Sequence, residues 1–173
     1  SIVAHPNVSA ISFTGSTRVG HAIALECAKS FKKVTLEMGG KNPAIVFDDA
    51  PKQNLVSNIA RLSFQNSGQI CLCGSRILVH ASIYAQFKVD FVQHAQALII
   101  GDPSHPNTRL GPVMSKAHFD KILDYIALAK QEGGQILCGG ESLQLAGELV
   151  GGWFIAPTVI EGLPMNSRFC QEE

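Results

Sequence analysis

The sequence predicts an α/β fold in which a sheet is covered by helices on both faces, a three-layer arrangement. Short apolar runs typical of strands alternate with longer segments that have helical periodicity. This order is expected where helices form the crossover connections between strands. The 173 residues are 46% hydrophobic and 16% charged, so the chain can bury a substantial core, and this composition argues against disorder.

The first helix is predicted between two strands. Residues 10–13 are an apolar run that ends at a Thr-Gly-Ser-Thr turn. A helix is expected over about 17–30, because Ile23 and Cys27 fall four apart on one helical face. Residues 33–38 (KVTLEM) are predicted as the second strand, and two glycines close it.

A second strand–helix–strand unit is expected to follow. Residues 43–47 read as a strand, and Asp48-Asp49-Ala50-Pro51 as a helix start, since acids and proline favour the first turn. The apolar stripe of this helix is Leu55, Ile59 and Leu62. Residues 75–80 are predicted as the next strand.

The remaining half predicts two long helices and a final strand pair. The helices are expected over 82–100 and 115–131, separated by a loop rich in glycine and proline; Ile122, Leu123 and Ile126 form the stripe of the second. Strands are expected over 135–138 and 153–160, and an antiparallel arrangement of this last pair is possible because a glycine-rich turn region separates them.

Charge and composition exclude several classes of function. Fourteen basic and fourteen acidic residues give zero formal net charge, so neither nucleic acid nor an anionic membrane is an expected partner. No apolar run is long enough for a membrane span. Five cysteines, an odd number, favour free thiols and a reducing compartment, so a cytoplasmic protein is expected. A start at Ser1, without methionine, suggests a piece of a longer protein.

Residues 13–20 (FTGSTRVG) place a glycine turn between a strand and a helix. A helix N-terminus offers unpaired backbone N–H groups to a phosphate, and glycine permits close approach of a ligand. A plain turn explains the same residues equally well, so this motif by itself is a weak signal.

Glu37, in LEMGGK, lies at the carboxyl end of the second strand. In an open α/β sheet this edge faces the ligand crevice, and apolar surroundings would favour the neutral acid and make Glu37 a better base near neutral pH. An exposed glutamate at a strand end is the simpler alternative.

Residues 64–76 (FQNSGQICLCGSR) hold Cys71 and Cys73, for which four interpretations compete. A zinc site needs a second cysteine pair or suitably spaced histidines, and a redox pair needs Cys-x-x-Cys; the sequence has neither. Buried thiols are common, and Cys73 fits that description. Cys71 differs because Asn66, Gly68 and Gln69 precede it, so that backbone N–H groups and a side-chain amide would bind an oxyanion beside a nucleophile.

Taken together, FTGSTRVG, LEMGGKNP and FQNSGQIC resemble, in order and spacing, the cofactor, glutamate and cysteine motifs of the aldehyde dehydrogenase superfamily. The resemblance covers the whole chain and is closest to the branch that oxidises 2-aminomuconic and 2-hydroxymuconic semialdehydes. Further support comes from the runs at 110–113, 152–154, 157–159 and 172–173.

The resemblance implies a role for each matching residue. Cys71 would be the nucleophile that forms a thiohemiacetal and then a thioester, and Glu37 the general base for thioester hydrolysis. NAD, with NADP as the other possibility, would accept the hydride. Ser16 would contact the cofactor pyrophosphate and Glu173 the nicotinamide ribose. Cofactor binding is also expected at Gly15, Gly20 and Gly39.

The resemblance also implies a substrate channel and a division into domains. The channel residues would be Phe64, Gln65, Ile70 and Leu72, where a polar Gln65 suits a polar or carboxylated aldehyde. Residues 1–41 would be the C-terminal part of the NAD(P)-binding domain, and 42–173 an aldehyde dehydrogenase-like catalytic domain, incomplete at its C-terminus. The chain alone is expected to be inactive, and the full-length protein a homo-oligomer that needs no metal.

Two other classes of function stay open on the sequence. In the first, the chain is a non-catalytic remnant or folding domain that acts only through association. In the second, it is a thiol-reactive or metal-binding module that uses Cys71 and Cys73. Missing sheet partners would also leave apolar surface exposed, from which self-association is expected.

Overall fold

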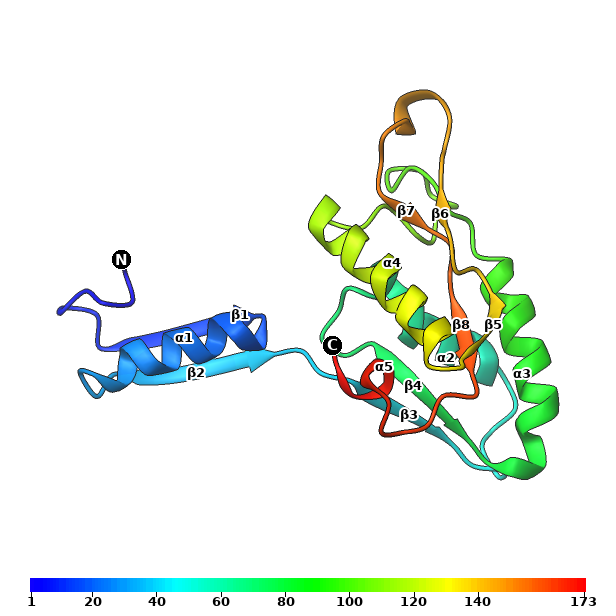
Figure 1. Cartoon of the computed structure of the whole chain (residues 1–173), viewed down its shortest axis with the longest axis horizontal. Helices are drawn as coiled ribbons and strands as arrows, with labels where there is room; N and C mark the ends of the chain where they lie inside the picture. The colour runs from blue at the N-terminus through cyan, green and yellow to red at the C-terminus, as the bar shows by residue number, and fades with distance from the viewer. The chain divides into compact units, whose positions relative to one another are not determined.

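The computed structural model describes all residues from Ser1 to Glu173 and divides into two compact units, Ser1–Gly40 (unit 1) and Lys41–Glu173 (unit 2). The boundary lies one residue before the division at 41/42 expected from the sequence. Figure 1 draws the elements of both units, which are described separately below.

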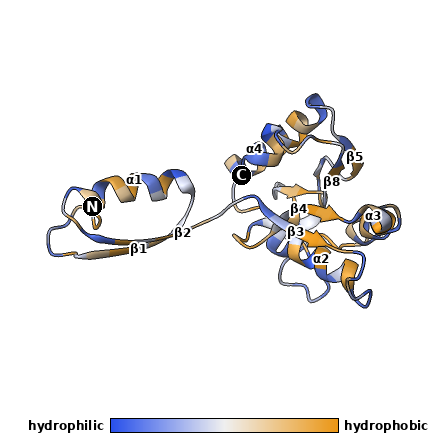
Figure 2. Ribbon diagram, turned by 90° about the horizontal axis from the view of Figure 1, so that it is seen from below, coloured by the Kyte–Doolittle hydropathy of each residue, from blue (hydrophilic) through white to orange (hydrophobic).

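Unit 1 is one strand–helix–strand motif. Strands β1 (Ala10–Gly15) and β2 (Lys33–Met38) pair in parallel, with Phe13 opposite Leu36. Helix α1 (Thr17–Ala28) connects them and lies along one face of the pair, as Figures 1 and 2 both show. Cys27 is 1% exposed, which confirms the predicted inward face of this helix.

Unit 2 begins with a second motif of the same kind. Strands β3 (Asn42–Val46) and β4 (Gly74–Val79) are parallel, and helix α2 (Leu55–Phe64) lies between them in the chain. Helix α3 (Ala81–Gln96) follows. The core forms where the two helices meet the strands, from Val46, Ala60, Phe87 and Phe91, and the last two rings stack with centroids 5.7 Å apart.

The rest of unit 2 is helix α4 (Lys116–Gln131) and short antiparallel ladders. Strand β5 (Gln135–Cys138) pairs with β8 (Val159–Glu161), and β6 (Ser142–Leu143) with β7 (Phe154–Ile155). The antiparallel last pair is thereby confirmed. Single turns of 3-10 helix occur at Gln65–Gly68 (η1) and Gly147–Leu149 (η2), and a short helix α5 (Arg168–Gln171) comes last.

Most predicted bounds lie within two residues of the observed ones, and three predictions were wrong by more than that. Helix α2 begins at Leu55 rather than near Asp48, because Asn54 adopts a left-handed backbone (φ 58°) that a helix cannot continue from. Helix α3 ends at Gln96, since Ile100 already pairs with Leu110 in a bridge. The single strand expected over 153–160 is two strands, interrupted where Thr158 Oγ1 turns back to the Ala156 carbonyl at 2.8 Å.

The mixed α/β content is confirmed, whereas the three-layer arrangement stays a prediction, because the strands form four two-stranded ladders. Strands β3 and β4 contain several strongly apolar residues (Figure 2). Ile45 and Phe47, which follows β3, are 60% and 61% exposed, and Leu78 lies opposite Ile45. None of the helices combines the length and apolar character needed to span a membrane.

Candidate active site

The turn that carries Cys71 has an unusual backbone. Asn66, Ser67 and Gly68 have φ values of 52°, 56° and 77°, so three consecutive residues are left-handed. The turn closes where Gln69 N donates to the Asn66 carbonyl at 3.1 Å. Cys71 follows, is exposed, and its backbone N–H donates to no acceptor within the chain. Cys71 therefore has an exposed thiol and, on its own backbone, an N–H without an acceptor in the chain. A nucleophile with an oxyanion donor requires these two groups.

Cys73 is 8% exposed, which confirms its prediction as a buried thiol. Its Sγ lies 3.7 Å from the Gln65 carbonyl. All five cysteines are free. No group of three or more His, Cys, Asp or Glu side chains in residues 1–173 is arranged to hold a metal ion.

Sequence reasoning missed the residues that anchor this turn. Asn42, the first residue of β3, donates from Nδ2 to the carbonyls of Cys71 at 2.5 Å and Cys73 at 3.2 Å. Ser67 Oγ donates to the Gly111 carbonyl at 2.8 Å, and Gln69 Oε1 accepts from Met114 N at 2.9 Å. In the sequence, Asn42, Ser67 and Gln69 are recognisable only as polar residues close to glycines.

The four predicted channel residues differ in their surroundings. The Phe64 ring stacks on Phe91 with centroids 6.1 Å apart and packs against the core of unit 2. Ile70 is half-buried, whereas Gln65 and Leu72 are exposed, Leu72 by 73%. Ile70 and Leu72 are the chain neighbours of Cys71, and Leu72 and Gln65 lie at the surface, while Phe64 packs inside.

Glu37 lies near the end of β2 in unit 1, opposite Thr14, with Gly39 just beyond it. Its side chain is exposed, so the apolar surroundings expected from the sequence are not present within unit 1. Cys71, by contrast, belongs to unit 2.

The N-terminus of α1 suits an anionic ligand. Ser16 is the N-cap, and its Oγ accepts from Val19 N at 3.4 Å, which leaves its own hydroxyl hydrogen free to donate. No acidic residue occupies the first turn of α1, so the positive end of the helix dipole is not neutralised. Beside this helix a shallow hollow of about 370 Å³ is lined mainly by small and apolar side chains, among them Val19, Ala22 and Ile23.

The glycines of this motif have packing reasons of their own. A Cβ on Gly15 would lie 2.6 Å from the Phe13 ring, and one on Gly20 would lie 2.6 Å from Met38 Sδ. Gly20 is buried, and its N–H donates to the Ser16 carbonyl at 2.9 Å. Gly20 therefore allows α1 to approach β2 closely, and the predicted contact of either glycine with a cofactor stays a prediction.

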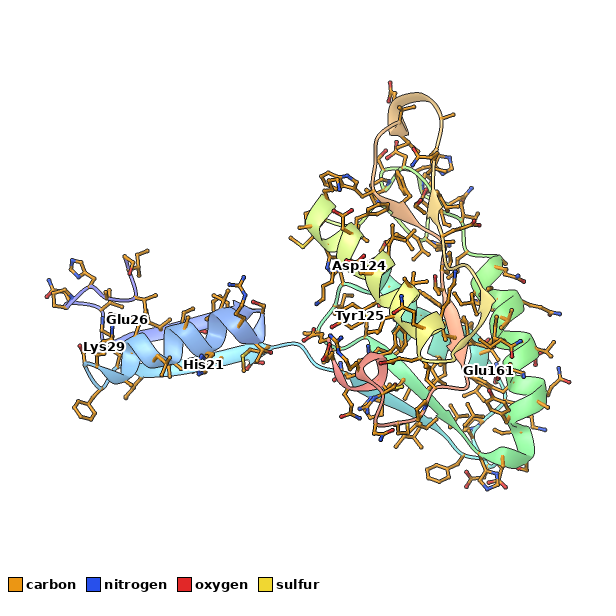
Figure 3. The ribbon with its side chains drawn as sticks, in the orientation of Figure 1. His21, Glu26, Lys29, Asp124, Tyr125 and Glu161 are labelled. Atoms are coloured by element: carbon orange, nitrogen blue, oxygen red, sulfur yellow. The ribbon has the colours of Figure 1, made fainter.

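The C-terminal residues form a charged cluster on α4 and α5. Glu172 accepts from Arg168 at 2.9 and 3.0 Å and from the Tyr125 hydroxyl at 2.6 Å (Tyr125 is labelled in Figure 3). The Arg168 bonds, followed by the Tyr125 bond, lower the pKa of Glu172 to about 2. Glu173 has an exposed side chain, and its backbone carbonyl accepts from Lys121 Nζ at 2.6 Å. The side-chain carboxylate of Glu173 makes no hydrogen bond or ion pair within the chain.

Comparison with known proteins identifies what this chain is similar to. A model of the Aldehyde dehydrogenase family matches residues 1–173. The 2-aminomuconic semialdehyde dehydrogenase of Danio rerio is 44% identical over 175 residues, which cover 100% of this chain and 36% of that protein. The 4-trimethylaminobutyraldehyde dehydrogenase B of the same organism is 41% identical over 170 residues, covering 98% of this chain and 33% of that protein.

Solved structures agree with the sequence matches. The crystal structure of betaine aldehyde dehydrogenase from Staphylococcus aureus in complex with NAD⁺ superposes with a TM-score of 0.93 at 36% identity, covering 99% of this chain and 34% of that one. The chain therefore spans about a third of the length of the relatives that it matches.

Proposed function

Because the chain belongs to the aldehyde dehydrogenase family, we propose that it carries the nucleophile and the base of an enzyme that oxidises an aldehyde to a carboxylic acid. The observation that supports this most directly is the exposed Cys71 thiol, presented on a left-handed turn beside its own free N–H. Of the two cysteines near this turn, Cys71 is exposed and Cys73 is buried, and Cys71 is the one that matches the cysteine motif of the family.

The proposed reaction begins when the Cys71 thiolate attacks the aldehyde carbon. The Cys71 N–H donates to the oxyanion of the resulting thiohemiacetal. Collapse of this adduct expels a hydride, which NAD accepts when bound, and leaves a thioester on Cys71. Glu37 then takes a proton from water, the hydroxide attacks the thioester carbon, and the carboxylic acid leaves as the thiolate is restored.

The groups at the N-terminus of α1 in unit 1 suit a dinucleotide. The Ser16 hydroxyl and the N–H groups of the first turn of α1 would donate to its pyrophosphate, and the apolar hollow beside Val19 and Ile23 would receive a flat base. The Glu173 carboxylate would accept from a ribose hydroxyl. NAD is proposed over NADP because NAD⁺ is bound in the Staphylococcus aureus structure.

The proposed substrate is a carboxylated semialdehyde of the 2-aminomuconic or 2-hydroxymuconic type. Identity to the two Danio rerio relatives differs little, 44% against 41%, so the proposal depends on the exposed amide of Gln65, six residues before Cys71 in the chain. An amide both donates to and accepts from a polar substrate, which a phenylalanine side chain at this position would not do.

The test measures NADH formation by a full-length protein that contains this chain, because the chain alone is expected to be inactive, with 2-hydroxymuconic semialdehyde and with a straight-chain alkyl aldehyde. The protein should prefer the former, and Gln65→Phe should narrow that preference. Cys71→Ala should abolish turnover, whereas Glu37→Gln should leave an acylated Cys71 that mass spectrometry detects. Turnover that survives Cys71→Ala would refute the proposal, and a chain that never turns over and never becomes acylated would support a non-catalytic role.

We also propose that the protein self-associates and is cytoplasmic. The exposed Ile45, Phe47 and Leu78 form an apolar face that a second copy would cover, and five free thiols suit a reducing compartment. Light scattering should show oligomers that Phe47→Glu disperses. A monodisperse monomer at high concentration would contradict the first proposal, and native disulfides in the isolated protein would contradict the second.

A further inference from the structure

The turn before Cys71 needs external support. Asn66 and Ser67 are left-handed without being glycine, and such residues persist only where surrounding contacts hold them. Both lie at the surface or half-buried, so packing alone does not fix them. The support comes instead from two side chains of the turn, Ser67 and Gln69, which reach the segment 111–114 ahead of α4.

The Gln69 amide uses both of its ends. Nε2 donates to the Asn66 carbonyl at 3.0 Å, and Oε1 accepts from Met114 N at 2.9 Å. The two partners fix the orientation of the amide, because a carbonyl needs a donor and an N–H needs an acceptor. Glutamate would bring a charged oxygen to the Asn66 carbonyl, and asparagine would be one methylene too short, so glutamine alone satisfies both partners.

Ser67 makes a parallel connection. Its Oγ donates to the Gly111 carbonyl at 2.8 Å, and this bond is partly buried. Two hydrogen bonds thus join one strained turn to one short segment, 44 and 45 residues away in the sequence. Because the turn is held at Ser67 and at Gln69, the peptide N–H groups that follow it, including that of Cys71, have a fixed direction.

We propose that Gln69 and Ser67 are positioning residues, which hold the turn against segment 111–114 so that the Cys71 N–H points at the oxygen of the adduct. The inference rests on the proposed function of Cys71 as nucleophile and adds to it the elements that orient the oxyanion donor. Asn42 also holds the Cys71 carbonyl, so the chain is anchored both before and after the Cys71 N–H.

The test compares two reactions of Cys71 in this chain. In acylation by p-nitrophenyl acetate, the thiolate attacks the ester carbon through an oxyanion, the C–O bond breaks, p-nitrophenolate leaves and a thioester remains. Alkylation by iodoacetamide forms an S–C bond, expels iodide and passes through no oxyanion. The ratio of the two rate constants, assigned to Cys71 by peptide mass spectrometry, therefore reports on the N–H donor rather than on thiol exposure or ionisation.

Gln69→Ala, Gln69→Glu and Ser67→Gly should each lower the acylation-to-alkylation ratio by about tenfold, less than the ~10²–10³-fold that loss of a whole oxyanion donor costs. Ser67→Gly is the safeguard on folding, because glycine accepts the positive φ while removing the hydroxyl. Gln93→Glu, on an exposed position of α3 without a side-chain hydrogen bond, is the matched control and should keep the wild-type ratio.

An unchanged ratio in Gln69→Ala and Ser67→Gly would overturn the inference while leaving the proposed function intact. If wild-type Cys71 were acylated no faster than the half-buried Cys170, the proposed function would fail, and the inference with it.

Discussion

The side-chain amide of Asn42 donates to the carbonyl of Cys71 at 2.5 Å. Asn42 lies five residues after Glu37 in the chain, so the segment that carries the proposed base continues directly into the residue that anchors the proposed nucleophile. The same amide reaches the Cys73 carbonyl at 3.2 Å. The turn that presents Cys71 is therefore attached to the first residue of β3 as well as to segment 111–114.

Replacement of Asn42 should destabilise unit 2 in a manner that depends on pH. Asn42→Ala removes two hydrogen bonds, for which we expect a loss of about 1–2 kcal/mol in the free energy of unfolding. Asn42→Asp places a carboxylate against two carbonyl oxygens and should cost more at pH 7. Below the ordinary aspartate pKa of about 3.9 the protonated acid donates again, so the Asp variant should recover relative to the Ala variant. Denaturant unfolding of both variants across pH measures this, and equal losses at pH 7 would count against it.

The Tyr84 hydroxyl of α3 donates to Glu161 of β8, a residue labelled in Figure 3, and Lys88 Nζ lies 3.1 Å from the same carboxylate. The bond to Glu161 raises the pKa of Tyr84 to about 12. A raised pKa means that the bond stabilises the fold fully below pH 10, and that this contribution is lost as the pH rises towards 12. Ultraviolet titration should show late ionisation of Tyr84, and Glu161→Gln should return it towards pH 10. Since Tyr125 is the only other tyrosine, Tyr125→Phe isolates the signal.

Acid should release the end of the chain. The Arg168 bonds lower the pKa of Glu172 to about 2, so this carboxylate stabilises the α4–α5 contact above its ordinary value of 4.5, and the contribution is lost as the pH falls from 4.5 towards 2. The Arg168 Nε–H resonance should therefore keep its position in NMR spectra until the pH falls below 4.5. Glu172→Gln should shift this resonance at every pH, and an Arg168 signal that already moves between pH 7 and 5 would contradict the assignment.

Two glycines with similar backbones should differ sharply in their tolerance of alanine. Gly139 has φ 69°, and a Cβ there would lie 2.3 Å from the Pro157 carbonyl oxygen, which is backbone and cannot move aside. Gly151 has φ 81° but nothing within 4 Å. We expect Gly151→Ala to cost about 1 kcal/mol from conformation alone, and Gly139→Ala to cost at least about 3 kcal/mol. Thermal unfolding measures both, and equal shifts would contradict the close contact between Gly139 and the Pro157 carbonyl.

The elements with strong local patterns could be predicted from the sequence. Strands β2 and β5 have the expected bounds, and helices α1 and α4 lie where Ser16 and Ser115 cap them. The start of α2 could not be predicted, because the left-handed Asn54 overrides the favourable acids and proline before it. The break at 156–158 depends on Thr158 accepting from Gly140 N across the fold, which no local pattern reveals.

The residues of the candidate site also divide into those that local sequence patterns predict and those that they do not. Cys71 and Glu37 are predicted as site residues because their motifs are local in sequence, and the burial of Cys73 could be predicted because its neighbours are apolar. Asn42, Ser67 and Gln69 were missed as anchors, since their partners lie 29 to 45 residues away. Tertiary hydrogen bonds of this kind depend on register and on loop direction, neither of which a single sequence specifies.

The central claim is that Cys71 is the thiol that attacks an aldehyde. The most direct measurement is the rate of iodoacetamide labelling at each of the five cysteines, by peptide mass spectrometry, with and without 2-hydroxymuconic semialdehyde. Cys71 should label fastest, and the aldehyde should slow Cys71 alone because a thiohemiacetal masks its thiolate. Labelling of Cys71 that the aldehyde leaves unchanged, or slows no more than that of Cys170, would contradict the account.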